Sequence, residues 1–491
     1  MKKIIWLFIL IVFAFGCNET DFLNETPVSY INSMNFYNTS DEFEQAINSA
    51  YTSLQPLHGG RGVGANESGW AFGELRSDNT TFQYNESNRA AMAFEQLDEF
   101  TMDSGNGIIA SAWDNSYIGI SKCNTVLSYI ENTEVENKER YIAEAKFLRA
   151  YYYFHLVRHF GDVPLITDVI KGYNQAFELN KRVSATLIYE LIITDLEEAK
   201  GNLPASYDAP DAGRATAGAA KTLLAKVLMW NGRYSDAAKE LKEVYTSGQY
   251  SLLDDYSSLF DINNENNEEI VFSVQYITGP HNLYHTLMYR FLPHDSGTEY
   301  LPLGQIEQTG FNIPTADLID SFEEGDDRLS TIDFSWVTDK DPVYQNSIVP
   351  FTKKYMDNGH TIRTQTGNNV KIFRYPHVLL MLAECYLREG GGDPLPLVNA
   401  VRLRAKLQPL SSVSLDDIIH ERRVEFHCEL DRWDVLVRTG KAVEVMTAHG
   451  NQQRERKFVG ENSYKKIKLL FPIPDKALDL DPTMEQNPEY K

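Results

Sequence analysis

Cysteine is scarce in this chain, and the sequence also lacks an excess of positive charge. Only four cysteines occur in 491 residues, at positions 17, 123, 385 and 428, and none forms the CxxC pair of a structural zinc site. The 46 Lys and Arg residues are outnumbered by 69 Asp and Glu residues, for a net charge of −23. Nucleic-acid binding needs clustered positive charge, so no nucleic-acid partner is expected. Neither a disulfide framework nor a structural metal is expected.

The N-terminus has the features of an exported protein. Lys2 and Lys3 precede an apolar run from Ile4 to Phe15, which is too short to cross a bilayer because a spanning helix takes about 20 residues. Such a run after positive residues is typical of a secretory signal peptide. Cys17 directly follows Ala14-Phe15-Gly16, a loose lipobox, which predicts lipidation of Cys17 and a membrane anchor. The alternative is an ordinary signal peptide with an incidental cysteine.

The predicted mature chain is more acidic than the whole chain. Loss of Lys2 and Lys3 with the signal peptide leaves 44 positive and 69 negative residues, a net charge of −25. This charge suits an exported protein. It also favours neutral ligands over polyanionic ones, because like charges repel.

Apolar periodicity predicts a mostly α-helical protein. Ser40 is placed as the N-cap of a helix that runs to about residue 57, because acidic residues follow it in the first turn. In Ala217–Tyr245, Ala225, Gly232 and Ala238 have the spacing of a tetratricopeptide repeat: two helices, a tight Gly turn and small residues where the helices approach. One repeat is too few for stability, so several should pack together. Further helices are predicted over 109–130, 137–160, 183–201, 214–231 and 234–246.

The pattern changes in the middle of the chain. Residues 269–274 alternate like a strand, and loops rich in Gly, Pro, Asp and aromatic residues follow. Residues 59–88 also have the composition of a loop. Helices return over 376–389, 395–406 and 415–430, and residues 467–472 are predicted as a strand. The predicted organisation is a signal peptide (1–16), a tether (17–39), a helical region (40–250), a loop-rich insertion (251–372) and a second helical region (373–491).

No enzyme signature is found. Gly213 and Gly218 have the spacing of a phosphate loop, but Ala219 and Ala220 stand where Lys and Ser or Thr belong, and Lys221 and Thr222 come two residues late. The pairs His155/His159 and His281/His285 lack the glutamate and the third ligand of a zinc site, and no GxSxG motif occurs. We therefore predict a non-catalytic protein without a metal or cofactor. A glycosidase stays an alternative, because paired carboxylates are recognised only in three dimensions.

Aromatic residues are the abundant feature, with 27 Tyr, 25 Phe and 6 Trp. A Trp or Tyr ring presents a flat apolar face and a polar rim, which suits stacking on the C–H face of a sugar. Trp113, Trp230 and Trp433 lie in predicted helices and are expected in the core, whereas Trp70 and Trp336 lie in loop-like segments. A mixture of rings and polar side chains favours a ligand cleft. The candidate binding residues are Trp70, Asn79 and Tyr84 from the first loop and Tyr284, Tyr300 and Trp336 from the insertion.

Five segments carry a family resemblance. They are AEAKFLRAYYYFHLVRHFGDVPLI (143–166), FRYPHVLLMLAECYLREGG (373–391), NAVRLRAKL (399–407), ERRVEFHCELDRWDVLVRTGK (421–441) and LLFPIPDKALDLDPTMEQNPEY (469–490). In sequence and order they resemble the RagB/SusD family of Bacteroidetes outer-membrane lipoproteins. The resemblance implies a mostly α-helical bundle of tetratricopeptide-like hairpins that supports a loop-rich ligand-binding face. It also implies that the motif residues are structural: Arg149, Tyr151, Tyr152, Asp162, Glu421, Arg422, Arg423, Glu425 and Arg432.

The resemblance implies a function as well. Family members act at the cell surface as lids over a SusC-like TonB-dependent transporter and capture oligosaccharides or, in some cases, peptides. We therefore expect a lipid-anchored, surface-exposed outer-membrane protein that delivers an oligosaccharide to such a transporter. A peptide-binding protein of the same architecture and a tetratricopeptide-type scaffold for protein partners are the alternatives. If Trp70 binds the glycan, Trp70→Ala should weaken binding and leave the melting temperature nearly unchanged.

Overall fold

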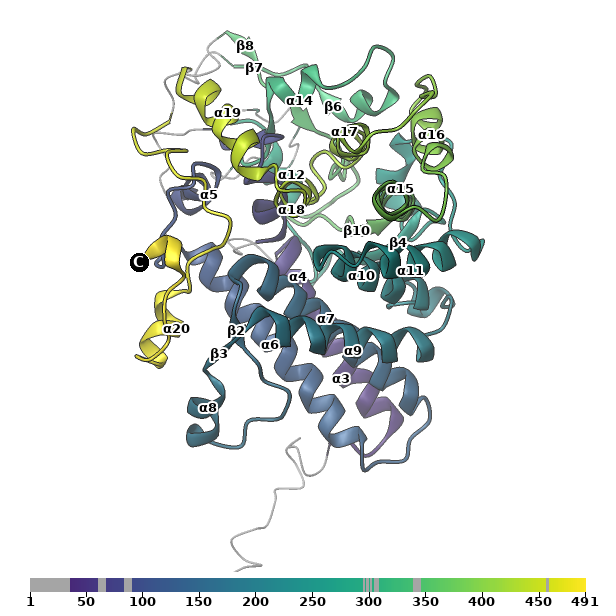
Figure 1. The fold of residues 1–491 in the computed structure, drawn as a ribbon, viewed down its shortest axis with the longest axis vertical. Helices are drawn as coiled ribbons and strands as arrows, with labels where there is room; N and C mark the ends of the chain where they lie inside the picture. The colour runs from purple at the N-terminus through teal and green to yellow at the C-terminus, as the bar shows by residue number, and fades with distance from the viewer. Residues whose placement is uncertain are drawn as a thin grey trace, which may run out of the picture.

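The computed structural model describes residues 36–60, 68–83, 91–294, 296, 300, 303, 309–338, 346–455 and 459–491. Cys17, the predicted signal peptide and most of the predicted tether lie outside this range. The described chain is mostly helical, with short antiparallel strands (Figure 1). The predicted fold class is confirmed.

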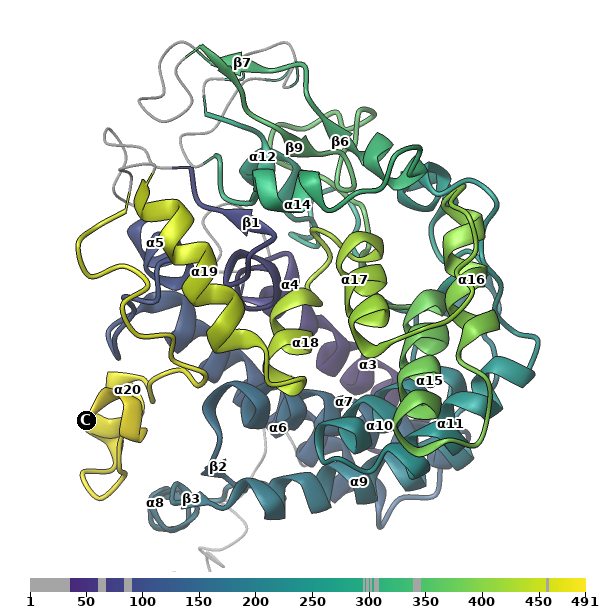
Figure 2. The same cartoon turned by 45° about the horizontal axis from the view of Figure 1, so that its top comes forward.

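The N-terminal half is a bundle of helices. Helix α7 packs against α6 and α9, α10 packs against α9 and α11, and α11 packs against α15 of the C-terminal half (Figure 2). This is the side-by-side arrangement that the tetratricopeptide spacing predicts. The helices are α3 (Ser40–Thr52), α4 (Leu54–His58), α6 (Gly107–Ile130), α7 (Lys138–Phe160), α9 (Ala185–Asn202), α10 (Ala217–Trp230) and α11 (Tyr234–Thr246).

The turn between α10 and α11 shows how the local sequence specifies a hairpin. Gly232 has a φ of +71°, a left-handed conformation that glycine adopts without steric strain. The next amide, of Arg233, donates to the Leu228 carbonyl at 2.8 Å and closes the end of α10. Ala225 and Ala237 are fully buried, and Ala238, the alanine of the repeat spacing, is half-buried.

The first helix differs from the prediction at both ends. Its N-cap is Thr39, because the Thr39 hydroxyl accepts from the Glu42 amide and the Glu42 carboxylate accepts from the Thr39 amide at 2.9 Å. This capping box makes Ser40 the first helical residue instead. The predicted single helix is also interrupted at Ser53, between α3 and α4.

Residues 68–83, predicted as part of a loop, are folded into the core. They form the π-helical turn η1 (Ala71–Leu75) and strand β1 (Thr80–Thr81). Glycine here reflects close packing, not an exposed turn. A Cβ on Gly73 would lie 2.1 Å from the Leu430 carbonyl oxygen, and one on Gly69 would lie 2.5 Å from His58 Nδ1.

The middle of the chain holds short elements and most of the strands. The strand predicted over 269–274 is confirmed as β4 (Ile270–Val274), which pairs antiparallel with β10 (Val370–Arg374). The other antiparallel pairs are β1–β5 (Ile313–Pro314), β2 (Val163–Pro164)–β3 (Arg182–Val183), β6 (Ile332–Asp333)–β9 (Phe351–Thr352) and β7 (Val337–Thr338)–β8 (Ser347–Ile348). The remaining short helices of the first two regions are α5 (Met92–Asp98), α8 (Tyr173–Leu179), η3 (Ala209–Asp211), η4 (Ser257–Phe260), η5 (Ile262–Asn264), α12 (Leu287–Phe291), α14 (Ala316–Asp320) and η6 (Asp327–Thr331).

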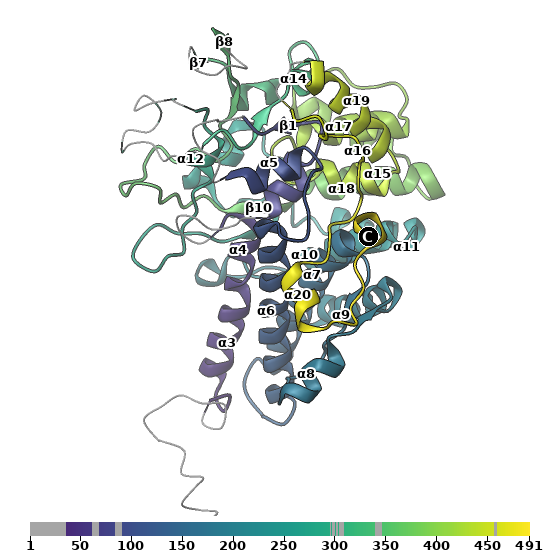
Figure 3. The same ribbon diagram turned by 90° about the vertical axis from the view of Figure 1, so that its left-hand side faces the viewer.

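The C-terminal region returns to helix and ends in a tail that crosses back to the bundle. Residues 467–472, predicted as a strand, are not one. The Phe471 amide donates to the His159 carbonyl at the end of α7 at 2.8 Å, and the Asn487 side chain donates to the Phe160 carbonyl at 2.9 Å. These bonds replace a strand ladder, and the tail lies beside α6 (Figure 3). The elements are α15 (Tyr375–Glu389), α16 (Leu395–Arg404), α17 (Leu415–Glu425), α18 (Arg432–Arg438), α19 (Ala442–Glu455), α20 (Asp475–Leu480) and η7 (Pro488–Tyr490).

The charged motif residues hold helices together, as the resemblance implied. Arg149 of α7 forms a two-bond pair with Asp195 of α9, both at 2.8 Å. Arg432 of α18 forms a similar pair with Asp78, also with both bonds at 2.8 Å. A planar guanidinium fits a carboxylate with two parallel bonds, which fixes orientation as well as distance.

A buried ion-pair network joins the insertion to the C-terminal helices. Arg374, at the end of β10, is fully buried and donates to Glu269, Glu425 and Glu429. Burial alone would raise the pKa of Glu425, but Arg404, Arg374 and Arg328 hold that pKa well below its usual value. The network members are Glu269, Asp326, Arg328, Lys354, Arg374, Arg404, Glu421, Glu425 and Glu429.

Asp98 makes the stability depend on pH in a way that can be measured. Its carboxylate accepts from the Phe82 amide at 2.8 Å and from the Tyr464 hydroxyl at 2.7 Å, and burial raises its pKa to about 7. The unfolded pKa is about 4, so this group's contribution is full below pH 4 and is lost as the pH rises to about 7. Asparagine does not ionise. The free energy of unfolding of Asp98→Asn minus that of the wild type should therefore increase as the pH rises from about 4 to about 7, as measured by urea denaturation.

The control for this prediction is Asp479→Asn on the exposed side of α20. The free energy of unfolding of this variant should differ from that of the wild type by the same amount at each pH. A difference between Asp98→Asn and the wild type that also stays constant from pH 4 to 7.5 would contradict the assignment.

Candidate ligand-binding site

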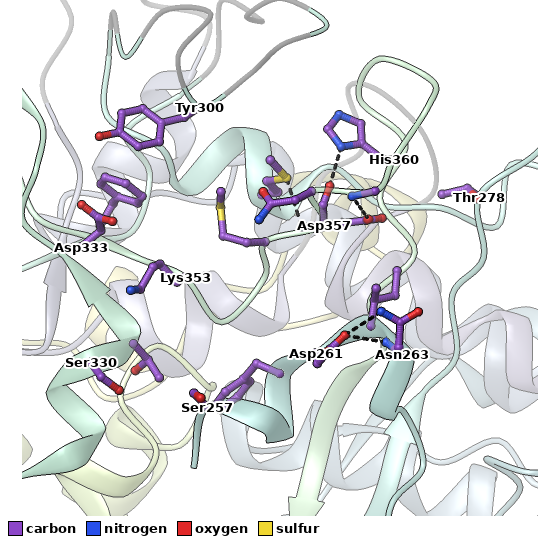
Figure 4. Close-up of a pocket in the computed structure, with 18 of the residues that line it drawn as sticks. Ser257, Asp261, Asn263, Thr278, Tyr300, Ser330, Asp333, Lys353, Asp357 and His360 are labelled. Carbon is purple, nitrogen blue, oxygen red and sulfur yellow. Dashed lines mark hydrogen bonds between the residues drawn. The ribbon is translucent and has the colours of Figure 1, made fainter. Parts of the chain in front are cut away.

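A cavity of about 930 Å³ opens among the short elements of the loop-rich insertion. Its walls come from η4 and η5, from η6 and β6, and from the segment after β9, residues 353–361 (Figure 4). In Figure 1 β6 lies toward the upper end of the molecule, and α3 and α8 lie toward the lower end. The helical bundle therefore supports the cavity from below.

One wall of the cavity is aromatic. Tyr300 and Phe351 both line it, with ring centroids 5.1 Å apart and planes at 71°. Trp336 packs beside Tyr300 at 6.2 Å, nearly perpendicular to it. Edge-to-face packing of this kind holds rings in fixed orientations. Tyr300 is half-buried and faces the cavity, so it is the ring placed to stack on a ligand.

The opposite wall is built around a buried aspartate. Asp357 accepts from the amides of Gly359 and Gly367, each at 3.2 Å. The Asp357 carbonyl lies 2.5 Å from Nδ1 of His360, and Nε2 of His360 lies 2.6 Å from the Tyr289 hydroxyl. A carbonyl only accepts, so Nδ1 carries the hydrogen and Nε2 accepts from Tyr289. These bonds fix the loop that carries Asn358, Gly359 and His360.

Two polar side chains in the cavity are uncommitted. Lys353 and Asn358 are exposed, and neither side chain has a hydrogen-bond or ion-pair partner among the described residues. They are available to a ligand without breaking a bond within the protein. The charged groups of the lining are the carboxylates of Asp261, Asp333 and Asp357 against the ammonium of Lys353. The cavity is therefore acidic overall.

Two family models match the chain in succession. One, described as "Starch-binding associating with outer membrane", matches residues 21–229, and the other, described as "SusD family", matches residues 330–490. The chain belongs to the RagB/SusD family. The matched ranges cover most of the predicted N-terminal region and nearly all of the C-terminal helices. Eight of the residues that line the cavity lie between the two matched ranges, and the other eleven, within 330–361, lie at the start of the second.

A curated relative and two solved structures are similar to this chain over most of its length. A SusD-like protein of Bacteroides ovatus is 28% identical over 89% of this chain and 82% of its own. Surface glycan-binding protein A from Bacteroides fluxus superposes with a TM-score of 0.79 at 26% identity, covering 92% of this chain and 100% of that one. A laminarin-binding SusD-like protein gives a TM-score of 0.77 at 27% identity with the same coverage.

Trp70 does not lie in the cavity of this RagB/SusD protein. It is fully buried, stacks on Phe94 at 4.9 Å and meets the edge of Phe291 at 5.1 Å. The segment was predicted to be a loop, but Gly69 lies against α4 and Gly73 against Leu430, two residues before α18. Trp70 is therefore a core residue, and its ring face is not available to a ligand.

Asn79 is also buried, and both ends of its side-chain amide are hydrogen-bonded. Its amide donates to Glu74 at 2.8 Å, and its oxygen accepts from Arg423 at 2.9 Å. Tyr84 lies outside the described residues. Tyr284 is 8% exposed and is buried outside the cavity lining. Of the predicted residues that the structure describes, Tyr300 lines the cavity, and Trp336 packs against Tyr300 without lining it.

Several lining residues were not predicted from the sequence. Met288, Lys353, Asp357, Asn358 and His360 are among them. Residues 357–359, Asp-Asn-Gly, are a turn signal after an aromatic segment, and this signal could have drawn attention to the loop.

The remaining negative observations concern only the described part of the chain. Cys123, Cys385 and Cys428 are buried and free. No cluster of three or more His, Cys, Asp or Glu side chains is arranged there to hold a metal ion. No described helix is both long enough and apolar enough to cross a membrane.

Proposed function

We propose that this RagB/SusD protein binds a neutral glycan in the cavity lined by Tyr300, Phe351 and Lys353. The observation that carries the proposal is the pairing of a fixed aromatic wall with uncommitted polar side chains in one open cavity. A sugar presents C–H faces to a ring and hydroxyl groups to polar side chains, so the aromatic wall and the polar side chains can each contact it. The glycan-binding relatives named above support the same ligand class.

The charges of the site favour uncharged glycans. Three carboxylates and one ammonium line the cavity, and the whole chain has a net charge of −23. A sulfated or uronate-rich polymer would meet like charge both on approach and in the site. Laminarin is a suitable first probe, because it is uncharged and a relative of 27% identity is described as binding it.

The proposal extends to where the protein acts. Cys17 after a short apolar run supports lipidation and a tether of about twenty residues to α3. The family model's description, "associating with outer membrane", supports that location. We propose that the anchored protein presents the cavity at the cell surface and, as the lid of a SusC-like TonB-dependent transporter, delivers its oligosaccharide there. The acidic surface would keep the protein soluble on its tether.

Tyr300→Ala tests the site. The substitution removes the ring from the cavity wall, and we expect laminarin binding measured by isothermal titration calorimetry to weaken about tenfold, since stacking of one ring contributes about 1–1.5 kcal/mol. Tyr300→Phe keeps the ring and should retain most of the affinity. Alginate, a uronate polymer, should not bind either variant or the wild type.

The matched control is Tyr173→Ala. Tyr173 is 80% exposed on α8, toward the opposite end of the molecule, so its loss should leave both binding and stability unchanged. Equal weakening by the two alanine variants, or undiminished binding by Tyr300→Ala, would overturn the site. Wild-type protein that binds none of laminarin, amylopectin and xyloglucan would overturn the proposed function itself.

A further inference from the structure

The cavity loop that carries Asn358 contains a reactive pair of residues. Asn358 is followed by Gly359, and both are exposed at the cavity. In an Asn-Gly pair the backbone nitrogen of the glycine can attack the side-chain carbon Cγ of the asparagine, because glycine has no Cβ to crowd that nitrogen. The chain contains three such pairs, at 106–107, 231–232 and 358–359. The structure around each pair decides whether the attack can take place.

The other two asparagines are held by hydrogen bonds. Asn106, the N-cap of α6, is 3% exposed, and its Nδ2 donates to two acceptors at 2.9 Å. Asn231 is exposed, but its Nδ2 donates to the Val227 carbonyl at 2.8 Å, and the Gly232 amide donates to the Met229 carbonyl at 3.1 Å. A bond of this kind has to open before the side chain can reach the next nitrogen, at a cost of about 1 kcal/mol.

Asn358 is neither buried nor bonded through its side chain. It is exposed and has no hydrogen-bond partner among the described residues. Asn358 and Gly359 are the central residues of a turn that the His360 amide closes on the Asp357 carbonyl at 3.3 Å, so only these two exposed residues need to move. The Gly359 amide donates to the Asp357 carboxylate at 3.2 Å. An acceptor therefore lies beside the proton that the attacking nitrogen has to lose.

We propose that Asn358 is a site of spontaneous deamidation, which adds a negative charge to the binding cavity as the protein ages. The Gly359 nitrogen bonds to Cγ of Asn358 and gives up its proton, while the Cγ–Nδ2 bond breaks and Nδ2 leaves with that proton as ammonia. Water then opens the cyclic imide and leaves aspartate or isoaspartate at position 358. Water is the only co-reactant, and no atom changes its oxidation state.

The product changes what the cavity offers to a ligand. The lining already has the carboxylates of Asp261, Asp333 and Asp357 against the ammonium of Lys353, so a further carboxylate makes it more acidic. The amide of Asn358 can donate a hydrogen bond to a sugar hydroxyl, whereas a carboxylate only accepts. Glycan binding should therefore weaken as the protein ages. This effect rests on the proposed function, whereas the conversion itself does not.

Peptide mapping measures the conversion. The protein is incubated at pH 7.5 and 37 °C and digested with trypsin, which releases Asn358 in peptide 355–363 and Asn231 in peptide 227–233. Deamidation raises the mass of a peptide by about 1 Da. Asn358 should convert about fivefold faster than Asn231, whose side-chain bond has to open first, and Asn106 should stay unchanged over the same period.

Two controls separate the effect of structure from that of sequence. In urea the hydrogen bonds are lost, so Asn358 and Asn231 should convert at similar rates. In Gly359→Ala the added Cβ would have Oδ1 of Asp357, at 3.8 Å, as its nearest described neighbour, an ordinary contact that the fold tolerates. This methyl group crowds the attacking nitrogen and should slow the conversion of Asn358 about tenfold. Equal rates for Asn358 and Asn231 in the folded protein would overturn the site.

Calorimetry with laminarin measures the effect on the cavity. Asn358→Asp reproduces the added charge and should bind about fivefold more weakly, the effect of one lost hydrogen bond. Incubation should weaken the wild type towards the same value, whereas Gly359→Ala should keep its starting affinity. Asn231→Asp, in the exposed turn after α10, is the matched control and should bind like the wild type.

The outcomes separate the two proposals. Undiminished binding by Asn358→Asp would overturn the effect on the cavity and leave the proposed function standing. Failure of the wild type to bind any glycan would overturn the proposed function together with this effect. Peptide mapping would still decide the conversion, because it does not depend on a ligand.

Discussion

Replacement of Arg374 by methionine is expected to lower the free energy of unfolding by about 3–5 kcal/mol, because it removes one partner from a buried ion-pair network. Arg374 is fully buried and lies 2.6 Å from Glu269, 2.8 Å from Glu425 and 2.8 Å from Glu429. Methionine fills similar space but offers no donor. The three carboxylates would then be buried with too little positive charge, and they would have to take up protons or draw in water.

The effect should reach beyond the cluster. Arg374 ends β10, Glu269 precedes β4, and Glu425 ends α17, so the network ties the insertion to the C-terminal helices. Urea denaturation followed by circular dichroism at pH 7 measures the change, and a lower yield of folded protein is expected as well.

Arg233→Met is the control for the ion-pair prediction. Arg233 forms an ion pair with Asp236 at 2.8 Å, but its side chain is half-exposed. A pair of this kind contributes little, so a change below about 0.5 kcal/mol is expected. Similar losses from the two substitutions would show that burial does not set the strength of these pairs.

Trp70→Ala is expected to lower the free energy of unfolding by about 3–5 kcal/mol, the usual result of removing a large buried ring. The ring is fully buried between Phe94 and Phe291, and Phe311 lies 6.1 Å away. Alanine would leave a void that these neighbours fill only partly. The sequence alone favoured the opposite result, a loss of glycan binding at an unchanged melting temperature.

Two measurements on Trp70→Ala decide between these expectations. Differential scanning fluorimetry should show a clearly lower melting temperature. Calorimetry well below that temperature should show laminarin affinity within about twofold of the wild type, since Trp70 is not part of the cavity lining. Weakened binding together with unchanged stability would place Trp70 in the binding site after all.

Together these substitutions separate the scaffold from the site. Arg374 and Trp70 lie in the core and act on stability, whereas Tyr300 lies at a cavity wall and acts on binding. Most of the aromatic residues likewise lie in the core and act on stability. Tyr151, for example, is buried and lies 2.7 Å from Nε2 of His58, and Tyr152 donates to the Ala50 carbonyl at 2.7 Å.

Regular helices could be predicted because their signals are local. Gly232 between two alanine-rich apolar stripes indicates a hairpin whatever surrounds it, and α10 and α11 form there. Errors arose where partners are distant in sequence. Residues 467–472 were predicted as a strand, but Phe471 bonds to His159, more than 300 residues earlier. Alternation of apolar residues shows which side chains are buried, and it does not show what the backbone pairs with.

The candidate site was predictable only in part for the same reason. Tyr300 and Trp336 were found because rings in a loop-rich insertion have few local partners. Lys353 and Asn358 were missed because a free polar side chain looks like any other in a sequence. Gly69 and Gly73 were read as signs of a loop, although each lies where another backbone or side chain leaves no room for a Cβ.

The sequence by itself determined the helical hairpins, the acidic character, the likeness to exported lipoproteins and the structural role of the charged motifs. These properties follow from periodicity, from composition and from motifs that are contiguous in the chain. Only the tertiary structure decided that Trp70 and Asn79 are core residues and that Tyr300 faces a cavity. Exposure depends on which distant segments pack over a side chain, and local sequence does not carry that information.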